Sequence, residues 1–94
     1  MQRDFKGVWI PKEVWLSEEL DIIDKVVLTE ITSLDNKETG CYASNSYLAS
    51  FCNCSERKIS SSIAKLSRLK LIDIFKTDGR KRYIHSKIVP SRIF

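Results

Sequence analysis

The sequence predicts an α+β fold, with three main helices and a small antiparallel sheet, and residues 44–82 carry the observations that predict it. A short amphipathic segment is followed by a four-residue turn and a longer amphipathic segment. An apolar run, an Asp-Gly pair and a cluster of cations come next. This order indicates two helices joined by a tight turn and followed by a β-hairpin.

Length and composition indicate one small intracellular domain. The chain has 94 residues, of which 43% are apolar, and can form one modest core. No apolar run approaches the roughly 20 residues of a membrane span, and the charged start MQRDFKGVWIPKE lacks the apolar region of a secretory signal. We therefore expect Cys41, Cys52 and Cys54 to be free thiols.

The charges are segregated along the chain. Residues 1–40 carry five cations and nine anions, a net charge of −4, and residues 41–94 carry eleven cations and three anions, a net charge of +8. A positive field on one half of a domain suits a polyanion such as nucleic acid. Chance clustering on a small protein is the alternative.

Residues 1–20 are expected to form a strand and a helical turn. The strand is predicted over residues 6–10, and Pro11 opens a turn that holds residues 13–16. Trp9 and Trp15 are expected in the core because each carries a large apolar area, with stacking on a base as the alternative for either.

Residues 21–35 are expected to form a scaffold helix, with Ser17 or Asp21 as the cap of this region. Its apolar face consists of Ile23, Val26, Val27, Ile31 and Leu34. The opposite side, expected in solvent and too acidic to be a DNA surface, consists of Asp24, Lys25, Glu30 and Thr32. A solvated, helix-stabilising role is expected for the carboxylates near the helix start, Glu18, Glu19, Asp21 and Asp24. A loop over residues 35–40 and an extended segment over 41–43 follow.

Residues 44–69 are expected to form the two helices and their turn. Ser44 caps the first helix, and Ser55 caps the second, which spans residues 56–69. The first helix buries Tyr47, Leu48 and Phe51. Asn53 is expected to take the left-handed conformation in the turn, because its short polar side chain tolerates positive φ.

The second helix has two distinct faces. Its apolar stripe consists of Ile59, Ile63, Leu66 and Leu69, and nearly opposite lie Arg57, Ser61, Ala64 and Arg68, flanked by Ser60 and Lys65. Small residues let a helix approach the floor of the major groove, and long cations reach phosphates or base edges.

Residues 71–85 are expected to form the hairpin, with strands over 71–75 and 80–85 and an Asp78-Gly79 turn. Four cations surround its tip, namely Lys76, Arg80, Lys81 and Arg82. They indicate a nucleic-acid contact, and the alternative is a solvated tip whose charges deter edge aggregation. Residues 86–94 are expected to be a tail.

No catalytic, cofactor or metal pattern is evident. His85 is the single histidine and has no nucleophile at a recognisable spacing, and the three glycines form no phosphate loop. Zinc sites use cysteine pairs separated by two to four residues, whereas Cys52 and Cys54 are separated by one. We expect no enzymatic activity, no cofactor and no metal.

Residues 21–75 resemble the winged helix-turn-helix domains of phage and plasmid replication proteins and of many bacterial regulators, in the helix DIIDKVVLTEITSL, the loop DNKETG and the run YASNSYLASFCNCSERKISSSIAKLSRLKLIDI. The opening RDFKGVWIPKEVWL resembles the start of replication-initiator or replisome-organiser proteins of Gram-positive phages and prophages. One position departs from the family pattern, because Lys70 stands where the family usually has Gly. A left-handed Lys70 would cost on the order of 1 kcal/mol relative to Gly.

The resemblance implies a DNA site. Arg57, Ser61 and Arg68 would face the major groove, with Lys58 and Lys65 at its edges. Phosphates would be bound at helix N-termini by Ser44, Asn45 and Ser55. The neighbouring backbone or minor groove would be followed by Lys76, Arg80, Lys81 and Arg82.

The implied function is binding of double-stranded DNA, as the N-terminal origin-binding domain of a phage or mobile-element replication protein in the bacterial cytoplasm. Its implied partners are a helicase or helicase loader and a second copy of the chain, with no membrane. Two alternatives remain. One is a transcriptional regulator on the same fold. The other is a protein-interaction module, such as a phage inhibitor of a host complex, whose binding face would be the acidic N-terminal half.

Overall fold

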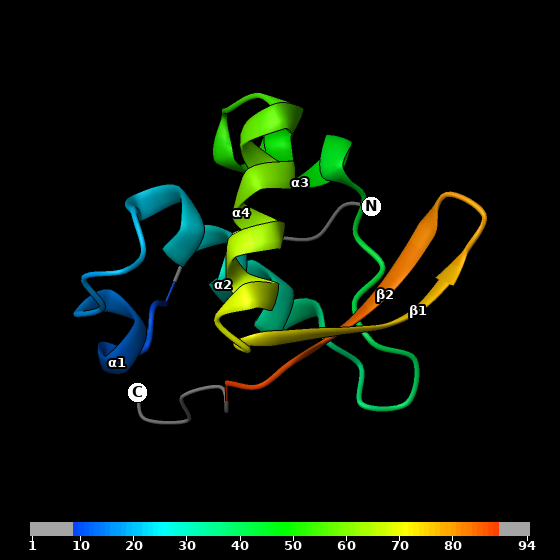
Figure 1. The fold of residues 1–94 in the computed structure, drawn as a ribbon, viewed down its shortest axis with the longest axis horizontal. Helices are drawn as coiled ribbons and strands as arrows, with labels where there is room; N and C mark the ends of the chain where they lie inside the picture. Colours follow the sequence, from blue (N-terminus) through cyan, green and yellow to red (C-terminus); the bar gives the residue numbers. More distant parts are fainter. Residues whose placement is uncertain (1–8, 89–94) are drawn as a thin grey trace.

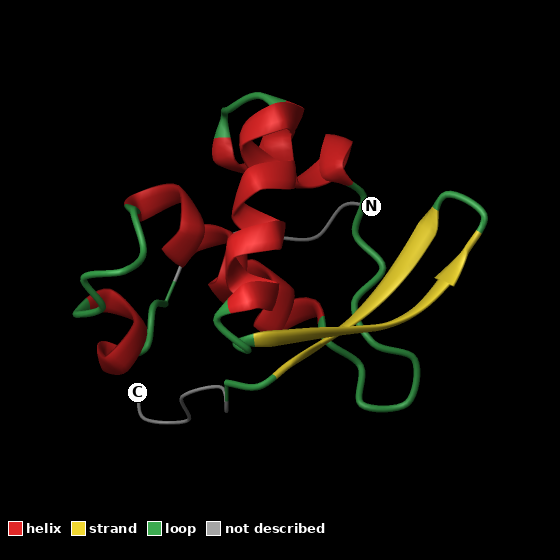
Figure 2. Ribbon diagram, viewed as in Figure 1, coloured by secondary structure: helices red, strands yellow, loops and turns green. Residues whose placement is uncertain are grey.

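The computed structural model describes residues 9–88, and within them it contains four helices and a two-stranded antiparallel sheet (Figure 1 and Figure 2). The elements are α1 (Lys12–Trp15), α2 (Ile22–Leu34), α3 (Asn45–Cys52), α4 (Glu56–Arg68), β1 (Ile72–Asp78) and β2 (Lys81–Ser86). The strand predicted for residues 6–10 falls mostly outside the described residues, and Trp9 and Ile10 have no regular secondary structure.

α2 begins where the sequence predicts. Asp21 is the N-cap, and its Oδ1 accepts from the Asp24 N–H at 2.8 Å. Asp24 in turn accepts from the Asp21 N–H at 3.0 Å. The reciprocal pair satisfies backbone donors that the first turn of a helix leaves without partners.

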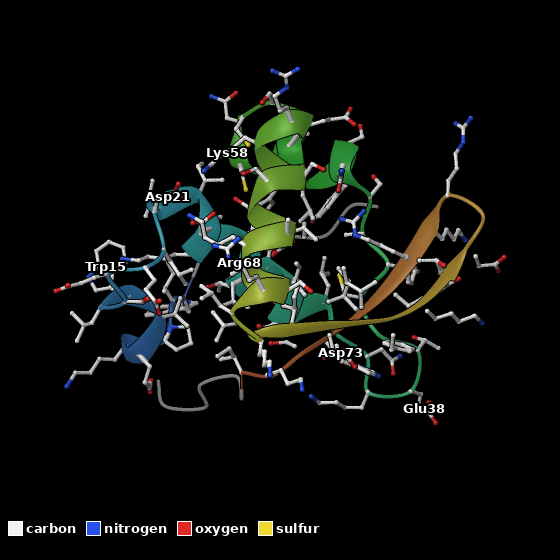
Figure 3. The ribbon with its side chains drawn as sticks, in the orientation of Figure 1. Trp15, Asp21, Glu38, Lys58, Arg68 and Asp73 are labelled. Carbon is white, nitrogen blue, oxygen red and sulfur yellow. The ribbon has the colours of Figure 1, made fainter. Side chains whose placement is uncertain are left out.

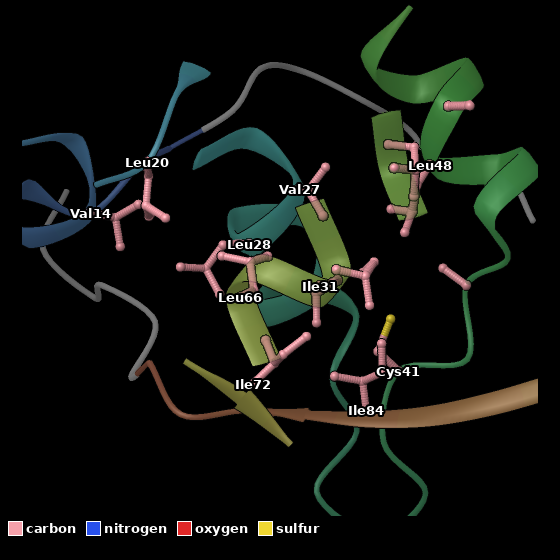
Figure 4. Packing of buried hydrophobic residues seen from close by; sticks show 14 residues of the cluster. Val14, Leu20, Val27, Leu28, Ile31, Cys41, Leu48, Leu66, Ile72 and Ile84 are labelled. Carbon is pink, nitrogen blue, oxygen red and sulfur yellow. The ribbon is translucent and has the colours of Figure 1, made fainter. Parts of the chain in front are cut away.

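The core lies among α2, α3, α4 and the inner face of the hairpin (Figure 4). α2 contributes Val27, Leu28 and Ile31, and Leu66 of α4 lies against them. The hairpin contributes Ile72 and Ile84 to the core, and α3 contributes Leu48. Ile59 and Ile63 of α4 are buried there as well. The apolar stripe predicted for α4 is therefore confirmed. The stripe predicted for α2 is confirmed in part, because Val27 and Ile31 are buried, whereas Val26 lies outside the core and Leu28, which was not predicted, is fully buried.

The tryptophans lie at the surface, so their predicted place in the core is wrong. Trp9 is 76% exposed and Trp15 is 52% exposed. α1 has only four residues, and the inward position on it belongs to Val14, which is 4% exposed. Lys25 of α2 covers part of Trp15, because its Nζ lies 5.1 Å from the ring centroid and donates to the Trp15 carbonyl at 2.5 Å.

Both helices of the helix-turn-helix end in the same way, on a left-handed residue that is not Gly. Asn53 has φ 55° after α3, as predicted, and Lys70 has φ 62° after α4. After α4, the Leu71 N–H donates to the Leu66 carbonyl at 2.9 Å and the Lys70 N–H donates to Ser67 at 3.0 Å. This pair of bonds is a Schellman motif, which satisfies carbonyls at the helix end and directs the chain into β1.

The hairpin is longer than the sequence predicts, and its loop is shifted by one residue. Asp78 pairs with Lys81, so the loop consists of Gly79 and Arg80. Gly79 has φ 62°, which is the arrangement of a type II′ turn with Gly at its first central position. A bulge at Phe75 interrupts the register between Ile74 and Lys76. Ser86, predicted to begin the tail, is the last residue of β2.

The segment after the loop joins the sheet through one residue. The Cys41 N–H donates to the Ile84 carbonyl at 2.7 Å, and the Ile84 N–H donates to Cys41 at 2.9 Å. The extended segment predicted at residues 41–43 is therefore confirmed at Cys41, and Tyr42 lies beside β2, with its ring centroid 6.3 Å from that of Tyr83.

A buried carboxylate ties the base of the hairpin to the end of α2. The Asp35 side chain is 2% exposed, and it accepts from the Ser86 N–H and is hydrogen-bonded to His85 Nδ1, both at 2.9 Å. Ser86 Oγ also shares a hydrogen bond of 2.6 Å with Thr32 Oγ1. Burial by itself would raise the pKa of Asp35, but the hydrogen bonds from Ser86 and His85 and the charges of His85 and Lys37 hold the pKa below its ordinary value.

Replacing Lys70 by Gly is expected to stabilise the domain by about 1 kcal/mol, because Gly adopts positive φ without a steric penalty. Urea unfolding monitored by circular dichroism measures the difference. Lys70→Ala is the matched control, since it removes the same charge and side chain but keeps the Cβ atom. Equal stabilities for the two variants would contradict a strained Lys70.

Asp35 is expected to make stability sensitive to acid. Because folding lowers its pKa, Asp35 stabilises the folded state above its unfolded-state pKa of about 3.9, and this contribution is lost as the pH falls through the folded-state pKa. Asp35→Asn should therefore be less stable at neutral pH and show a shallower decline below about pH 4. Urea unfolding across this range tests the expectation, with the exposed Asp73→Asn as control. A wild-type acid decline in Asp35→Asn would disprove it.

Candidate nucleic-acid interface

The solvent face of α4 carries the row of residues that the sequence predicts. Arg57, Ser61, Ala64 and Arg68 are all exposed, and Ser60 beside them is exposed as well. At 1.5 Å per residue, the Cα atoms of the two arginines are roughly 16 Å apart along the axis. Small side chains occupy the helix surface between them, so this surface can approach base edges while an arginine at either end reaches phosphates.

The two lysines of α4 are bonded to acidic residues of α2. Lys58 Nζ donates to Asp21 Oδ2 at 2.6 Å, and Lys65 Nζ donates to Asp24 Oδ2 at 2.5 Å. Figure 3 shows Asp21 and Lys58 together beside α4, with Arg68 nearer the other end of that helix. The family resemblance implies that Lys58 and Lys65 lie at the edges of the major groove, whereas in the structure their ammonium groups hold α4 against α2.

Asp24 is the centre of this contact, and its predicted solvated role is wrong. It is fully buried, and it also accepts a hydrogen bond of 2.5 Å from Ser62 of α4. Glu30 and Thr32, also predicted on the solvated side of α2, are 2% and 8% exposed, and Glu30 accepts from the Tyr47 hydroxyl at 2.6 Å. These side chains lie inside because α3, α4 and β2 pack on a wider face of α2 than its apolar residues mark.

The Asp21–Lys58 pair lies nearer to solvent, since 47% of the Asp21 side chain and 32% of the Lys58 side chain are exposed. Burial by itself would raise the pKa of Asp21, but the hydrogen bond from Lys58 and the Asp24 N–H lower it. The hydrogen bond to Asp21 raises the pKa of Lys58, so this lysine is held in its charged form.

The residues predicted to bind phosphates at helix N-termini lie at those termini. Ser44 caps α3 by accepting from the Tyr47 N–H at 3.0 Å, and Ser55 caps α4 by accepting from the Lys58 N–H at 3.1 Å. Both serines are exposed. Asn45 is the first residue of α3, and its Oδ1 is buried without a hydrogen-bond partner among the described residues.

Of the four cations predicted around the hairpin tip, three are exposed to solvent there. Lys76, Arg80 and Lys81 are exposed. Arg82 instead shares the inner side of β2 with Ile84 and is half-buried, and its Nε and Nη2 have no hydrogen-bond partner in the described part of the chain. Burial lowers the pKa of Arg82.

Sequence reasoning assigned no role to a row of aromatic side chains on the hairpin. The ring centroids of Tyr42 and Tyr83 are 6.3 Å apart, and those of Tyr83 and Phe75 are 6.4 Å apart. The alternation of Tyr83 with the apolar Ile84 along β2 was a signal for an aromatic outer face. Phe75 lies on this outer face because of the bulge in β1, and no sequence pattern predicts that bulge.

The cysteines are free thiols, as predicted, with Cys41 buried and Cys52 and Cys54 half-buried. Burial raises the pKa of Cys52 to about 11, with a further contribution from Cys54. Among residues 9–88, no group of three or more His, Cys, Asp or Glu side chains is placed to hold a metal ion. No helix within this range is both long enough and apolar enough to cross a membrane.

Lys65→Met is expected to lower the free energy of unfolding by about 3 kcal/mol. It removes the ammonium group bonded to the buried Asp24 carboxylate and leaves Lys58, whose Nζ lies 3.9 Å from Asp24 Oδ1, as its remaining cationic neighbour. Lys58→Met makes the same chemical change at a more exposed pair and should cost less than about 1 kcal/mol. Urea unfolding of both variants at pH 7 measures the two losses. Losses of equal size would rule out Asp24–Lys65 as the stronger contact.

Comparison with known proteins agrees with this geometry. A family described as "Helix-turn-helix domain" matches residues 18–72. A solved structure titled "N-Terminal domain of DNA binding protein" is similar to this chain at 18% sequence identity, with a TM-score of 0.63, over 98% of this chain and 89% of that chain. At this identity the likeness concerns the fold. Comparison with curated proteins finds no match. Because the family match covers more than half of the chain, and the hairpin follows the second helix of the motif, this chain belongs to the helix-turn-helix domain family in its winged form.

Proposed function

We propose that this protein binds double-stranded DNA, with α4 in the major groove and the tip of the hairpin on the flanking backbone. The observation that carries the proposal is the exposed row on α4, where Arg57 and Arg68 lie at the ends and Ser61 and Ala64 lie between. In a helix-turn-helix the second helix enters the major groove, and α4 is that helix.

The acidic N-terminal part does not oppose this mode of binding. Asp24 forms an ion pair with Lys65, and Asp35 accepts from the Ser86 N–H and lies 3.7 Å from Lys37 Nζ, so both carboxylates have partners within the domain. Apart from Lys70 and Lys87, the exposed cations of residues 41–88 lie on α4 and the hairpin.

On the outer face of α4 and around the hairpin tip, five exposed cations are available for phosphates, namely Arg57, Arg68, Lys76, Arg80 and Lys81. Lys58 and Lys65 are excluded from this set because carboxylates of α2 hold their ammonium groups. Exposed serine caps and backbone N–H groups at the starts of α3 and α4 add uncharged donors, which position a helix without adding to the salt dependence.

The affinity for duplex DNA is expected to fall with salt with a logarithmic slope of roughly −4.5, since each of five phosphate contacts contributes about −0.9. Arg80→Ala with Lys81→Ala should flatten the slope by roughly two units. Fluorescence anisotropy on a labelled random duplex measures both quantities.

The control is Lys12→Ala with Lys37→Ala, which removes the same charge from exposed sites in the N-terminal part. It should leave the slope close to that of the wild type. A wild-type slope in the Arg80→Ala, Lys81→Ala variant would remove the hairpin tip from the DNA surface.

The biological role that we propose is origin recognition in a phage or mobile-element replication protein of the bacterial cytoplasm, with a helicase or its loader as partner. This rests on the resemblance of the opening RDFKGVWIPKEVWL, of which residues 3–8 lie outside the described range. Selection of bound sites from a random duplex library tests it. Origin-like repeats would support it, whereas a palindrome bound by two copies near a promoter would favour a transcriptional regulator.

One observation favours protein binding as a second candidate function. Four large apolar side chains of the acidic N-terminal part are exposed among the described residues, since Trp9 is 76%, Trp15 52%, Leu16 61% and Ile22 53% exposed. A module that has kept the fold and lost DNA binding would give no gel shift with random duplex at low salt, although the sample is folded.

A further inference from the structure

The outer face of the hairpin carries a row of aromatic rings. Ile84 and Ser86 of β2 point into the domain, and Tyr83 and His85 alternate with them on the other face. Tyr42 stands at one end of the row and is 50% exposed, and Phe75, on the bulge, is 41% exposed. Tyr83 lies between these two rings, with centroids 6.3 Å and 6.4 Å away.

The row is held in place from beneath. Phe75 stacks on His85, with centroids 4.2 Å apart and ring planes 9° apart, and His85 is hydrogen-bonded to the buried Asp35. Gly40 has φ 81°, and a Cβ atom there would meet Phe75 Cε1 at 2.7 Å. Two features that look unrelated in the sequence, a glycine and a histidine, thus fix one ring, so little ordering remains to be done when a ligand arrives.

Lysines lie over two of the rings. Lys76 Nζ is 5.3 Å from the centroid of Tyr83, and Lys81 Nζ is 5.6 Å from the centroid of Tyr42. A base stacked on an aromatic ring contributes more to binding than an exposed cation–π contact contributes to stability. A base can therefore replace the ammonium group, and the lysine is then free to contact the phosphate beside that base.

We infer that the outer face of the hairpin binds single-stranded nucleic acid, with unpaired bases stacked on Tyr42, Tyr83 and Phe75 and phosphates bound by Lys76 and Lys81. The rings are spaced at less than twice the roughly 3.4 Å rise between stacked base pairs. Neighbouring bases of a moderately extended strand can thus reach neighbouring rings. This combination of cations and aromatic platforms is the one used for unpaired strands without sequence preference.

Duplex DNA cannot stack on these rings, because its bases are already stacked on one another and present only their edges in the grooves. The stacking rings are also distinct from the row on α4 that the proposed function assigns to the major groove. The two modes of binding therefore predict opposite effects for variants of Tyr42 and of Arg57.

Fluorescence anisotropy of labelled oligothymidine and oligouridine of about 12 nucleotides tests the inference at low salt. Tyr42→Leu keeps an apolar side chain but removes the ring, and it should weaken binding by about five-fold to a hundred-fold. Tyr42→Trp retains a stacking ring and should bind within about two-fold of the wild type. Phe75→Leu is expected to weaken oligonucleotide binding by a similar factor to Tyr42→Leu. If the protein binds oligothymidine more strongly than oligouridine, the ligand is DNA, and the reverse order identifies RNA.

Two further readouts separate stacking from charge and from fold. Tyr42→Leu should leave the salt slope unchanged, because stacking neutralises no phosphate, whereas Lys76→Ala should flatten it by about one unit. Tyr42→Leu should also leave duplex affinity unchanged, and Arg57→Ala with Arg68→Ala should weaken duplex binding alone. Thermal unfolding confirms that each variant is folded.

Three results would overturn the inference. They are wild-type binding of the oligonucleotides by Tyr42→Leu, failure of the wild-type protein to bind them at low salt, and an equal loss of duplex affinity in Tyr42→Leu. Failure of duplex binding alone would sink the proposed function and leave this surface intact.

Discussion

The orientation of α4 depends on one buried carboxylate, that of Asp24. Its oxygens accept hydrogen bonds from the Asp21 N–H, the Ser62 hydroxyl and the Lys65 ammonium group. A buried carboxylate without such partners costs several kcal/mol, so the helices dock stably only with Ser62 and Lys65 turned toward α2. At 100° per residue, these two positions lie on average about 110° around the helix from Arg57. The contact that satisfies Asp24 therefore fixes which face of α4 meets solvent.

A second buried carboxylate has the same role at the hairpin. Asp35 binds the backbone of Ser86 and the ring of His85, and His85 supports Phe75. One acid thus anchors the base of the hairpin to α2 and also orders the aromatic outer face. These contacts explain in part why the acidic residues are concentrated in the N-terminal part of the chain and the basic residues in the C-terminal part. Several acids of the N-terminal part face inward as partners for α4 and β2. Five exposed cations of the C-terminal part lie on two surfaces, the face of α4 and the hairpin.

Most of the fold was accessible from local sequence patterns. The caps Asp21, Ser44 and Ser55, the left-handed Asn53 and the apolar stripe of α4 all follow from interactions within a few residues of the chain. The strain at Lys70 was also foreseeable, because the position needs positive φ and the side chain resists it. The candidate site was less accessible. Arg57, Ser61 and Arg68 lie where the helical period places them, but the surroundings of Lys58, Lys65 and Arg82 depend on what packs beside them.

By itself the sequence determined the order of the helices and strands, the turns between them and the cationic face of the second helix, since these depend on backbone propensities and on periodicity. Only the tertiary structure decided that Asp24 and Asp35 are buried and that the two tryptophans are exposed. It also decided that the ring of Tyr42, from the segment before α3, lies beside two rings of the hairpin. The physical reason is that burial is a property of contacts between segments far apart in the chain. Ser62 lies 38 residues from Asp24, and His85 lies 50 residues from Asp35. No local pattern shows which polar side chain will meet such a partner.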